Sequence, residues 1–454
     1  MDALSLREIA DMCGGTLRGS SSAMVRRVSK DTRTLVPGDI YLALRGDNHD
    51  GNVHAAAAAA KGAAAAILDR PESARDLPAD FPIIAVEDSL EALHRFASAW
   101  RDRLALKVVC ITGSSGKTST KEFTAAVLSA RYRVIKTEGN LNNHIGLPLS
   151  ILAASSADDA AVWEIGMNHA GEVAPLAKLA RPDLAIITNI GVAHIEYLGS
   201  REGIAQEKGS LLESLSPNGV AVLPAEDDFV AALSARTRAR VTLAGLNSGT
   251  VTATDIVMDA EGSRFLLQTD VESLHAHLPV PGLHMVKNAL LAVAAGLEFG
   301  LSLEECREGL SSTRLTGGRL SKRHIRGVTV LDDTYNANPD SMEAALATLG
   351  GIGARGNRIA ILGRMGELGT HAEEGYRRVG EAAAKSVDTL IAVGPETAPL
   401  VAAARAGGLQ PIHEFSEPAE AATLLREIAQ EGDIVLVKGS RAARMERVIQ
   451  NFEN

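Results

Sequence analysis

The chain has few cysteines: three in 454 residues, at Cys13, Cys110 and Cys306. They lie far apart and form no C-x-x-C pair, so the sequence predicts neither a disulfide framework nor a cysteine zinc site, and a reducing cytoplasm is expected. The chain also lacks a basic segment followed by an apolar run, the pattern of a secretory signal. No uncharged apolar stretch is long enough to span a bilayer. These absences predict a cytoplasmic protein without a membrane span.

The chain also has fewer basic than acidic residues. The formal net charge is −10, with 46 basic against 56 acidic residues, which argues against a general nucleic-acid-binding protein. What the chain does have is the composition of a folded protein, with 46% hydrophobic and 22% charged residues. Because a chain of this length exceeds one ordinary core, we expect two to four domains.

Three segments differ in their sequence pattern. Residues 1–83 contain short strand-like pieces and an alanine-rich run, which predicts a small-residue helix ending near Gly62 and then a buried strand. In residues 84–314 a linker helix over 89–103 precedes short apolar runs that alternate with helical pattern, as in a buried parallel sheet. Residues 315–454 repeat this alternation. The predicted fold is therefore α/β, with three domains in series.

A short glycine-rich stretch, ITGSSGKTST, resembles a phosphate-binding loop. The common pattern G-x-x-x-x-G-K-[ST] has four residues between its glycines, whereas only Ser114 and Ser115 separate Gly113 from Gly116. A predicted strand precedes the loop and a helix follows it, so backbone N–H groups at the helix N-terminus are expected to attract phosphates. An ordinary Gly/Ser turn before a helix is the alternative interpretation.

The residues after this loop have matching chemistry. Lys117 is expected to neutralise phosphate charge, and the Thr118 hydroxyl to ligate Mg²⁺. The shortened spacing and the lack of an N-K-x-D motif argue against a GTPase. The predicted nucleotide-binding residues of the loop are Gly113, Ser114, Ser115, Gly116, Lys117, Thr118 and Ser119.

Polar residues follow two later apolar runs. Glu164 ends the run AAVWE, and ligands of open α/β sheets bind at the carboxyl ends of strands, so Glu164 is a candidate Mg²⁺ ligand. His194 follows the next run, and Lys208 lies on the helix after it. Taken singly, they have ordinary interpretations as a solvated carboxylate, a structural histidine and a solvated lysine. Their predicted position at one sheet edge with the phosphate loop favours a shared site.

Together, the T-G-S-S-G-K-T loop, Glu164, His194 in G-V-A-H and Lys208 in E-K-G resemble the Mur ligase family. These are ATP-dependent amide-forming ligases of peptidoglycan assembly, related to folylpolyglutamate synthetase, and the resemblance extends over essentially the whole chain. It implies a small uridine-binding N-terminal domain, a central P-loop ATPase-like domain with a parallel sheet, and a C-terminal Rossmann-like domain. It also implies a monomer.

The resemblance further implies two Mg²⁺ ions. Thr118 and Glu164 would serve one, and His194 with a carbamylated Lys208 the other. The expected catalytic group is Lys117, Lys208, His194 and Glu164.

The stretch LDDTYNANPDSM resembles the signature of one branch of this family, which joins D-alanyl-D-alanine to UDP-N-acetylmuramoyl-tripeptide through an acyl phosphate. The D-Y-A-H-x-P and D-N-P-R motifs of the branch that adds a diamino acid do not occur. The resemblance places near ATP the residues Asn288, His284, Arg319 and Asp333. The substrate-binding residues that it implies are Thr32, Arg33, Gly46, Asn336 and Asn338.

Two positions depart from the family pattern: Met285 stands where asparagine is usual, and Arg364 where aspartate is common. Three alternatives stay open. They are a sister ligase adding another amino acid, a folylpolyglutamate synthetase, which lacks such a uridine-binding domain, and an ATP-hydrolysing regulatory switch. The sequence does not tell whether the third residue of the acceptor peptide is meso-diaminopimelate or lysine.

Overall fold

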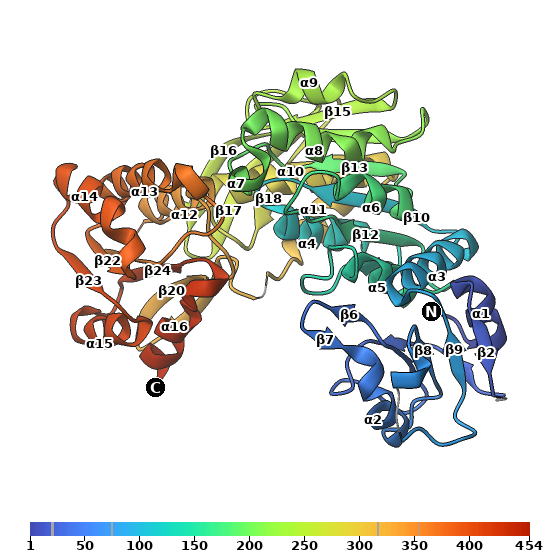
Figure 1. The fold of residues 1–454 in the computed structure, drawn as a ribbon. Helices are drawn as coiled ribbons and strands as arrows, with labels where there is room; N and C mark the ends of the chain where they lie inside the picture. Colours follow the sequence, from blue (N-terminus) through green and yellow to red (C-terminus); the bar gives the residue numbers. More distant parts are fainter. Residues whose placement is uncertain (20–21, 74–75, 316, 354) are drawn as a thin grey trace. The chain divides into compact units, whose positions relative to one another are not determined.

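The computed structural model, drawn in Figure 1, describes residues 1–19, 22–73, 76–315, 317–353 and 355–454. The chain divides into two compact units. The first comprises Met1–Cys110, Tyr132–Met167 and Glu172–Asp183, and the second comprises Ile111–Arg131, Asn168–Gly171 and Leu184–Asn454. None of the helices in the described part of the chain is long and apolar enough to cross a membrane.

The N-terminal part of the first unit is built on a five-stranded sheet with the order β2-β9-β8-β5-β4. Neighbouring strands from β9 to β4 pair in parallel, and β2 pairs antiparallel with β9 at the edge. The bounds are β2 Thr16–Arg18, β4 Val28–Ser29, β5 Ile40–Leu42, β8 Ala65–Leu68 and β9 Ile83–Ala85. Two short antiparallel pairs accompany it, β1 (Leu4–Ser5) with β3 (Met24–Val25) and β6 (Arg45–Gly46) with β7 (His49–Asp50).

The alanine-rich run folds as predicted. Helix α2 (Ala55–Ala60) ends before Gly62, whose φ of +87° reverses the chain, and all four residues of β8 are buried. Ala55 and Ala58 are fully buried in a cluster with Tyr41, where small side chains allow the helix backbone to approach the sheet.

The domain boundary predicted after residue 83 falls inside β9. This strand pairs with both β8 and β2 through Ala85, so the N-terminal sheet extends at least that far.

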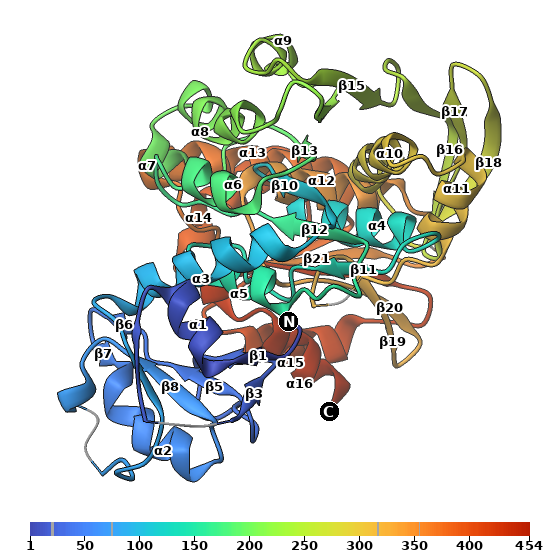
Figure 2. The ribbon, with the colours of Figure 1, turned by 90° about the vertical axis from the view of Figure 1, so that its right-hand side faces the viewer.

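The rest of the first unit starts with the predicted linker helix, α3 (Ser89–Arg103), which Asp88 caps. Helix α3 packs against α1 (Leu6–Cys13), as Figure 2 shows, and also against α5 (Gly146–Ala153) and α6 (Val173–Ala180). Strand β11 (Val134–Lys136) pairs in parallel with β12 (Ala160–Glu164), and every residue of β12 is buried. Strand β10 (Lys107–Thr112) crosses the division between the units after Cys110.

The second unit contains a mixed sheet. Strands β13 (Leu184–Ile187), β14 (Val220–Pro224) and β15 (Arg240–Gly245) pair in parallel. The first two match predicted apolar runs, whereas β15 was not predicted. These parallel strands are followed by three long strands that the sequence analysis missed, β16 (Val251–Asp259), β17 (Gly262–Thr269) and β18 (Ser273–Leu278), which pair antiparallel. In β17 buried and exposed residues partly alternate, so this strand lacks a continuous apolar run.

Six helices accompany these strands in the second unit. Helix α4 packs against α10 and α11, and α10 also contacts β14, β15 and β16. Most residues of α10 are buried, which makes it the central helix of this part of the chain. The bounds are α4 Lys117–Leu128, α7 Ile195–Leu198, α8 Arg201–Glu213, α9 Val230–Ser234, α10 Leu283–Glu298 and α11 Leu303–Ser311.

The C-terminal part of the second unit is a doubly wound domain, as predicted. Its sheet has the order β19-β20-β24-β21-β22-β23 and is parallel except for the edge strand β19. The strands are β19 Ser321–Ile325, β20 Val328–Asp333, β21 Arg358–Leu362, β22 Thr389–Val393, β23 Ile412–Phe415 and β24 Ile434–Lys438. The helices are α12 Pro339–Gly351, α13 Ala372–Ser386, α14 Ala398–Ala406, α15 Pro418–Ile428 and α16 Glu446–Glu453.

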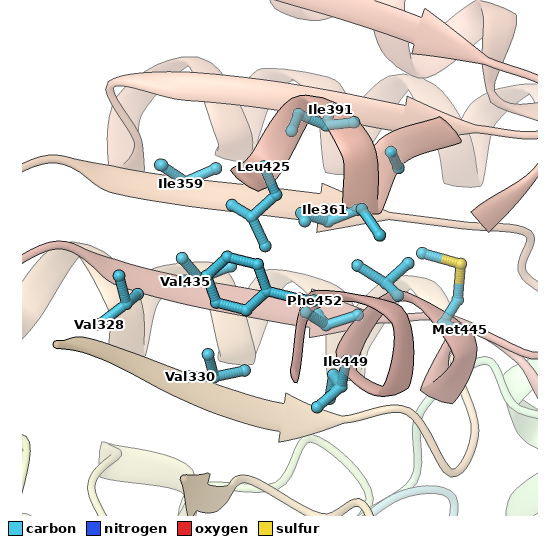
Figure 3. Packing of buried hydrophobic residues seen from close by; sticks show 14 of the residues in the cluster. Val328, Val330, Ile359, Ile361, Ile391, Leu425, Val435, Met445, Ile449 and Phe452 are labelled. Atoms are coloured by element: carbon cyan, nitrogen blue, oxygen red, sulfur yellow. The ribbon is translucent and has the colours of Figure 1, made fainter. Parts of the chain in front are cut away.

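One face of this sheet is covered by α15 and α16. Figure 3 shows Leu425 of α15 and Phe452 of α16 packed over Val435 and Ile361 of the central strands. Successive side chains of a strand point to opposite faces, and helices cover both, so the parallel strands read as continuous apolar runs. That pattern is what made four of the six strands recognisable.

Candidate active site

The shortened loop lies between β10 and α4, as predicted, and its two glycines are required by space as well as by backbone angle. Gly113 has a φ of +150°, and a Cβ atom there would lie 1.8 Å from the Thr188 hydroxyl oxygen. Gly116 has a φ of +79°, and its Cβ atom would lie 2.6 Å from the Asn288 amide nitrogen. Glycine is therefore the residue that both positions accept without rearrangement.

The segment after β13 holds the loop in shape. The Ser114 N–H donates to the Asn189 carbonyl (3.1 Å), and the Ser115 N–H donates to the Asn189 side-chain oxygen (3.0 Å). The Thr188 hydroxyl donates to the Ser115 carbonyl (2.5 Å), and the Gly191 N–H to the Ser114 hydroxyl (2.9 Å). The loop is thus preformed. The sequence analysis missed Thr188, Asn189 and Gly191, for which a strand-end position was the only signal.

Helix α4 begins directly at the loop. No side chain caps its N-terminus, because Gly116 occupies the capping position. Uncapped N–H groups at such an end, together with the helix dipole, favour an anion. Lys117, the first helical residue, donates from Nζ to the Gly113 carbonyl (2.9 Å), and Thr118 and Ser119 are buried in the first turn. The arrangement has the geometry of a phosphate site.

Lys208 of α8 is almost entirely buried, with 1% of its surface exposed. Desolvation lowers the pKa of its ammonium group well below the usual value, the nearby charge of Lys117 lowers it further, and Glu207 opposes the shift. The solvated-lysine interpretation is therefore wrong, and the side chain is a buried amine whose charged form is disfavoured.

Glu164 ends β12 in the first unit and has 2% of its surface exposed, so the solvated-carboxylate interpretation is also wrong. The Asn142 amide donates to its Oε1 (2.8 Å), and the Glu164 N–H donates to the Thr137 hydroxyl (3.0 Å). The strand-end position is as predicted, and the role of Glu164 as a metal ligand stays a prediction.

His194 precedes α7 with a left-handed backbone, at a φ of +65°. Its Nδ1 lies 2.6 Å from Oε2 of Glu367, within ion-pair distance but without hydrogen-bond angles, and this buried nitrogen has no hydrogen-bond partner among the described residues. The interaction with His194 is the main cause that lowers the pKa of Glu367. The sequence analysis missed Glu367, which lies in the loop after β21.

Two residues expected near the nucleotide lie at the start of α10. The Asn288 side chain adjoins Gly116 of the loop. His284 has its Nδ1 3.5 Å from the Thr348 hydroxyl, and burial lowers its pKa to about 4. Met285, one of the two departures from the family pattern, is buried in the same helix.

The C-terminal residues expected near ATP have polar or aromatic partners. Asp333, at the end of β20, accepts a hydrogen bond from Nζ of Lys438 (2.5 Å), and this buried lysine also donates to the Asn336 carbonyl (3.0 Å). The Arg319 guanidinium stacks on the Tyr335 ring, 3.7 Å from its centroid. Arg319 is therefore held in place, in contrast to a freely solvated linker charge. Thr316, three residues before it, lies outside the described residues.

The start of α12 contacts the phosphate loop directly. Asn338 caps this helix, and its amide donates to the Ser115 hydroxyl (3.1 Å). The structure therefore brings Asn338 to the loop, whereas the Asn336 side chain accepts from the neighbouring Ala337 N–H. The second departure, Arg364, is exposed and lies 3.7 Å from Glu396.

The residues predicted to bind uridine lie on the surface of the first unit. Arg33 pairs with Asp31 (2.6 Å), and the Thr32 carbonyl accepts from Nζ of Lys61 (2.7 Å). A Cβ atom at the exposed Gly46 would have no neighbour within 4 Å. The uridine contacts stay predictions.

A buried asparagine below the β6–β7 hairpin was missed. The fully buried Asn52 amide donates to both Asp50 and Asp69, at 2.7 Å each. This bridge ties the hairpin that carries Gly46 to the end of β8.

In the described part of the chain, no group of three or more His, Cys, Asp or Glu side chains is placed to hold a metal ion. The residues predicted to hold Mg²⁺ are Thr118, Glu164, His194 and Lys208. Two of them, the threonine and the lysine, are not among these residue types, so the predicted site does not require such a group.

The fold and the loop define a nucleotide-binding α/β protein. Three family models match the chain: Mur ligase family, catalytic domain, over 25–101; Mur ligase middle domain, over 111–296; and Mur ligase, glutamate ligase domain, over 318–441. The chain belongs to the Mur ligase family, and the predicted three-domain α/β architecture is confirmed.

The similarity extends over whole proteins. The UDP-N-acetylmuramoyl-tripeptide–D-alanyl-D-alanine ligase of Escherichia coli K12 is 36% identical, over 100% of this chain and 99% of that protein. The crystal structure of MurF from Acinetobacter baumannii superposes with a TM-score of 0.89 at 32% identity, covering 100% of this chain and 99% of that one. MurF from Thermotoga maritima in complex with ADP has a TM-score of 0.83 at 28% identity, covering 96% and 98%.

The depressed pKa of His284 has a consequence for stability. An unfolded histidine titrates near 6.5, so between that pH and about 4 the unfolded chain binds more protons than the folded chain. His284 therefore removes stability as the pH falls through this window. Between pH 6.5 and about 4, we expect the free energy of unfolding to fall less for His284→Asn than for the parent chain, by up to about 3 kcal/mol. Urea unfolding at several pH values measures the difference, and parallel curves would contradict it.

Proposed function

We propose that this chain is an ATP-dependent ligase that joins D-alanyl-D-alanine to UDP-N-acetylmuramoyl-tripeptide, giving the pentapeptide precursor of peptidoglycan together with ADP and phosphate. The observation that carries the proposal is that relatives with this name align over the full chain, all three domains included. The preformed phosphate loop and the buried Lys208 beside Lys117 supply the matching chemistry.

ATP is the proposed nucleotide. A MurF relative has been solved with ADP, and the loop of this chain offers an uncapped helix N-terminus next to a lysine. The proposed phosphate-binding residues are those from Gly113 to Ser119. Asn288 and His284 are proposed near adenine, and Arg319 and Asp333 at the phosphates and ribose.

The chemistry follows from the reactivity of carboxylates. A carboxylate is a poor acyl donor, so the tripeptide carboxylate takes the γ-phosphoryl group of ATP to form an acyl phosphate. The D-alanyl-D-alanine amine attacks the acyl carbon, and the tetrahedral intermediate loses phosphate. Lys117 offsets the repulsion between the carboxylate and the triphosphate. Exclusion of water from the site would protect the acyl phosphate from hydrolysis.

Magnesium fits the proposed residues by their chemistry. Hydroxyl and carboxylate oxygens are ligands that Mg²⁺ prefers, and Thr118 and Glu164 supply them. We assign His194 and a carbamylated Lys208 to a second ion. A buried amine with a lowered pKa is a nucleophile, and its reaction with CO₂ would replace a destabilised cation with an anionic ligand. When bound, Mg²⁺ neutralises charge on the phosphates during transfer.

The remaining assignments complete the proposal. The enzyme is a cytoplasmic monomer with domains of roughly 1–83, 84–314 and 315–454, the first boundary being shifted to beyond Ala85. Asn336 and Asn338 are proposed at the peptide substrate. The residues proposed at the uridine group are Thr32, Arg33 and Gly46.

The alternatives have less support. A folylpolyglutamate synthase of Mycobacterium tuberculosis shares the fold, with a TM-score of 0.63 at 20% identity over 80% of this chain. A UDP-N-acetylmuramoyl-L-alanyl-D-glutamate–2,6-diaminopimelate ligase has a TM-score of 0.54 at 19% identity. Neither approaches the full-length agreement with the D-alanyl-D-alanine ligases.

The direct test is phosphate release from Mg-ATP with UDP-N-acetylmuramoyl-tripeptide and D-alanyl-D-alanine, added separately and together. We expect turnover only with both, and a product with the mass of the pentapeptide. Release that needs neither would indicate an ATP-hydrolysing switch. Release with glutamate and a folate would indicate the synthetase.

Lys208→Met tests the role of the buried lysine. Methionine keeps most of the side-chain volume without the desolvated amine, so we expect a thermal midpoint at or above that of the parent chain. We expect kcat to fall by about 100-fold or more, with no recovery on addition of bicarbonate. Lys385→Ala, at an exposed position of α13, is the control and should leave both unchanged. A fully active Lys208→Met would contradict the assignment.

A further inference from the structure

Two carboxylates of the C-terminal domain hold the segment that runs from β13 to α7. Oδ2 of Asp340 accepts a hydrogen bond from the Val192 N–H (2.8 Å), while Arg378 donates to its other oxygen (3.1 Å). Two residues further on, Oε2 of Glu367 lies 2.6 Å from Nδ1 of His194. The Asp340 carboxylate therefore fixes the backbone of this segment, and the Glu367 carboxylate contacts the imidazole of His194. All these residues belong to the second unit.

Both members of the Glu367–His194 pair have unusual backbone conformations. The φ angles are +60° for Glu367 and +65° for His194, in the left-handed region that non-glycine residues seldom adopt. Such conformations persist where the surrounding structure holds them, and they concentrate at functional sites. The contact between Glu367 and His194 therefore costs backbone conformational energy at both residues.

The loop that carries Glu367 is also pressed against α7. A Cβ atom at Gly369 would lie 3.0 Å from Cγ of Glu196, so the two segments are in close packing next to the pair. The position of the Glu367 carboxylate is therefore set by packing as well as by its charge.

The chemistry of imidazole gives this contact a consequence. A neutral histidine has one protonated ring nitrogen, and the partner of one nitrogen decides the state of the other. A carboxylate at Nδ1 favours the Nδ1–H tautomer, in which Nε2 keeps its lone pair for a ligand. The Glu367 oxygen lies 2.6 Å from Nδ1 of His194 without hydrogen-bond angles, and Nδ1 has no hydrogen-bond partner among the described residues, so the contact acts through charge.

We propose that Glu367 is a positioning residue: its carboxylate holds the His194 ring in the Nδ1–H tautomer and so presents Nε2 as a ligand. The metal side of this inference rests on the proposed function, in which His194 serves Mg²⁺. Because Glu367 comes from the C-terminal domain, the His194 ring is held in this tautomer only while that domain contacts the segment after β13.

The first readout is the ring of His194 in the full-length, ligand-free protein. Histidine labelled with ¹⁵N, with the His194 signals assigned through His194→Gln, reports the tautomer by NMR. We expect the Nδ1–H form in the parent chain and loss of that preference in Glu367→Ala. Glu367→Gln should retain it in part, because an amide oxygen carries a partial negative charge next to Nδ1. Glu373→Ala, at an exposed position of α13, is the matched control.

The second readout is the Mg²⁺ concentration that gives half-maximal ligase turnover. We expect it to rise about 10-fold or more in Glu367→Ala and less in Glu367→Gln, with the KM for D-alanyl-D-alanine unchanged. A folded Glu367→Ala variant with the parent tautomer and the parent Mg²⁺ requirement would overturn the inference. A tautomer that depends on Glu367 in a protein without ligase turnover would support the positioning role and contradict the proposed function.

Discussion

The buried amine of Lys208 is the constraint on which the account of this site depends. An ammonium group loses its hydration on burial, the charge of Lys117 adds repulsion, and Glu207 opposes these effects only in part, so the pKa of Lys208 stays well below the usual value. The neutral amine is therefore favoured over the ammonium form. In the proposed function, conversion to a carbamate would supply an anion where a second metal needs a ligand. Burial of this one side chain would then be linked to its modification and to catalysis.

The segment from Thr188 to His194 connects the phosphate loop to the C-terminal domain. Its first part braces the phosphate loop through Asn189, and its last residue is the proposed metal ligand. The C-terminal domain contacts the same segment through Asp340 and reaches the loop through Asn338. A stretch that follows one buried strand therefore contacts both the phosphate loop and the C-terminal domain, and it ends at the proposed metal ligand.

Local pattern was enough to predict the elements that position the site. Helix α3, the run around Gly62, the loop from Gly113 and the buried strand ending at Glu164 all have signals within a few residues. Contacts between distant segments have none, and for that reason Asn189, Glu367 and Asn52 were missed. The burial of Lys208 is also set by its neighbours, since a helical lysine by itself indicates solvent.

The measurement that tests the central claim is ¹³C NMR of the protein equilibrated with ¹³C-bicarbonate. The account predicts a carbamate resonance in the parent chain that is absent in Lys208→Met and present in Lys385→Ala. A spectrum without a resonance that depends on Lys208 would show that the buried amine stays unmodified. The proposed second Mg²⁺ would then need another ligand, and the cost of burying this lysine would not be offset by its modification.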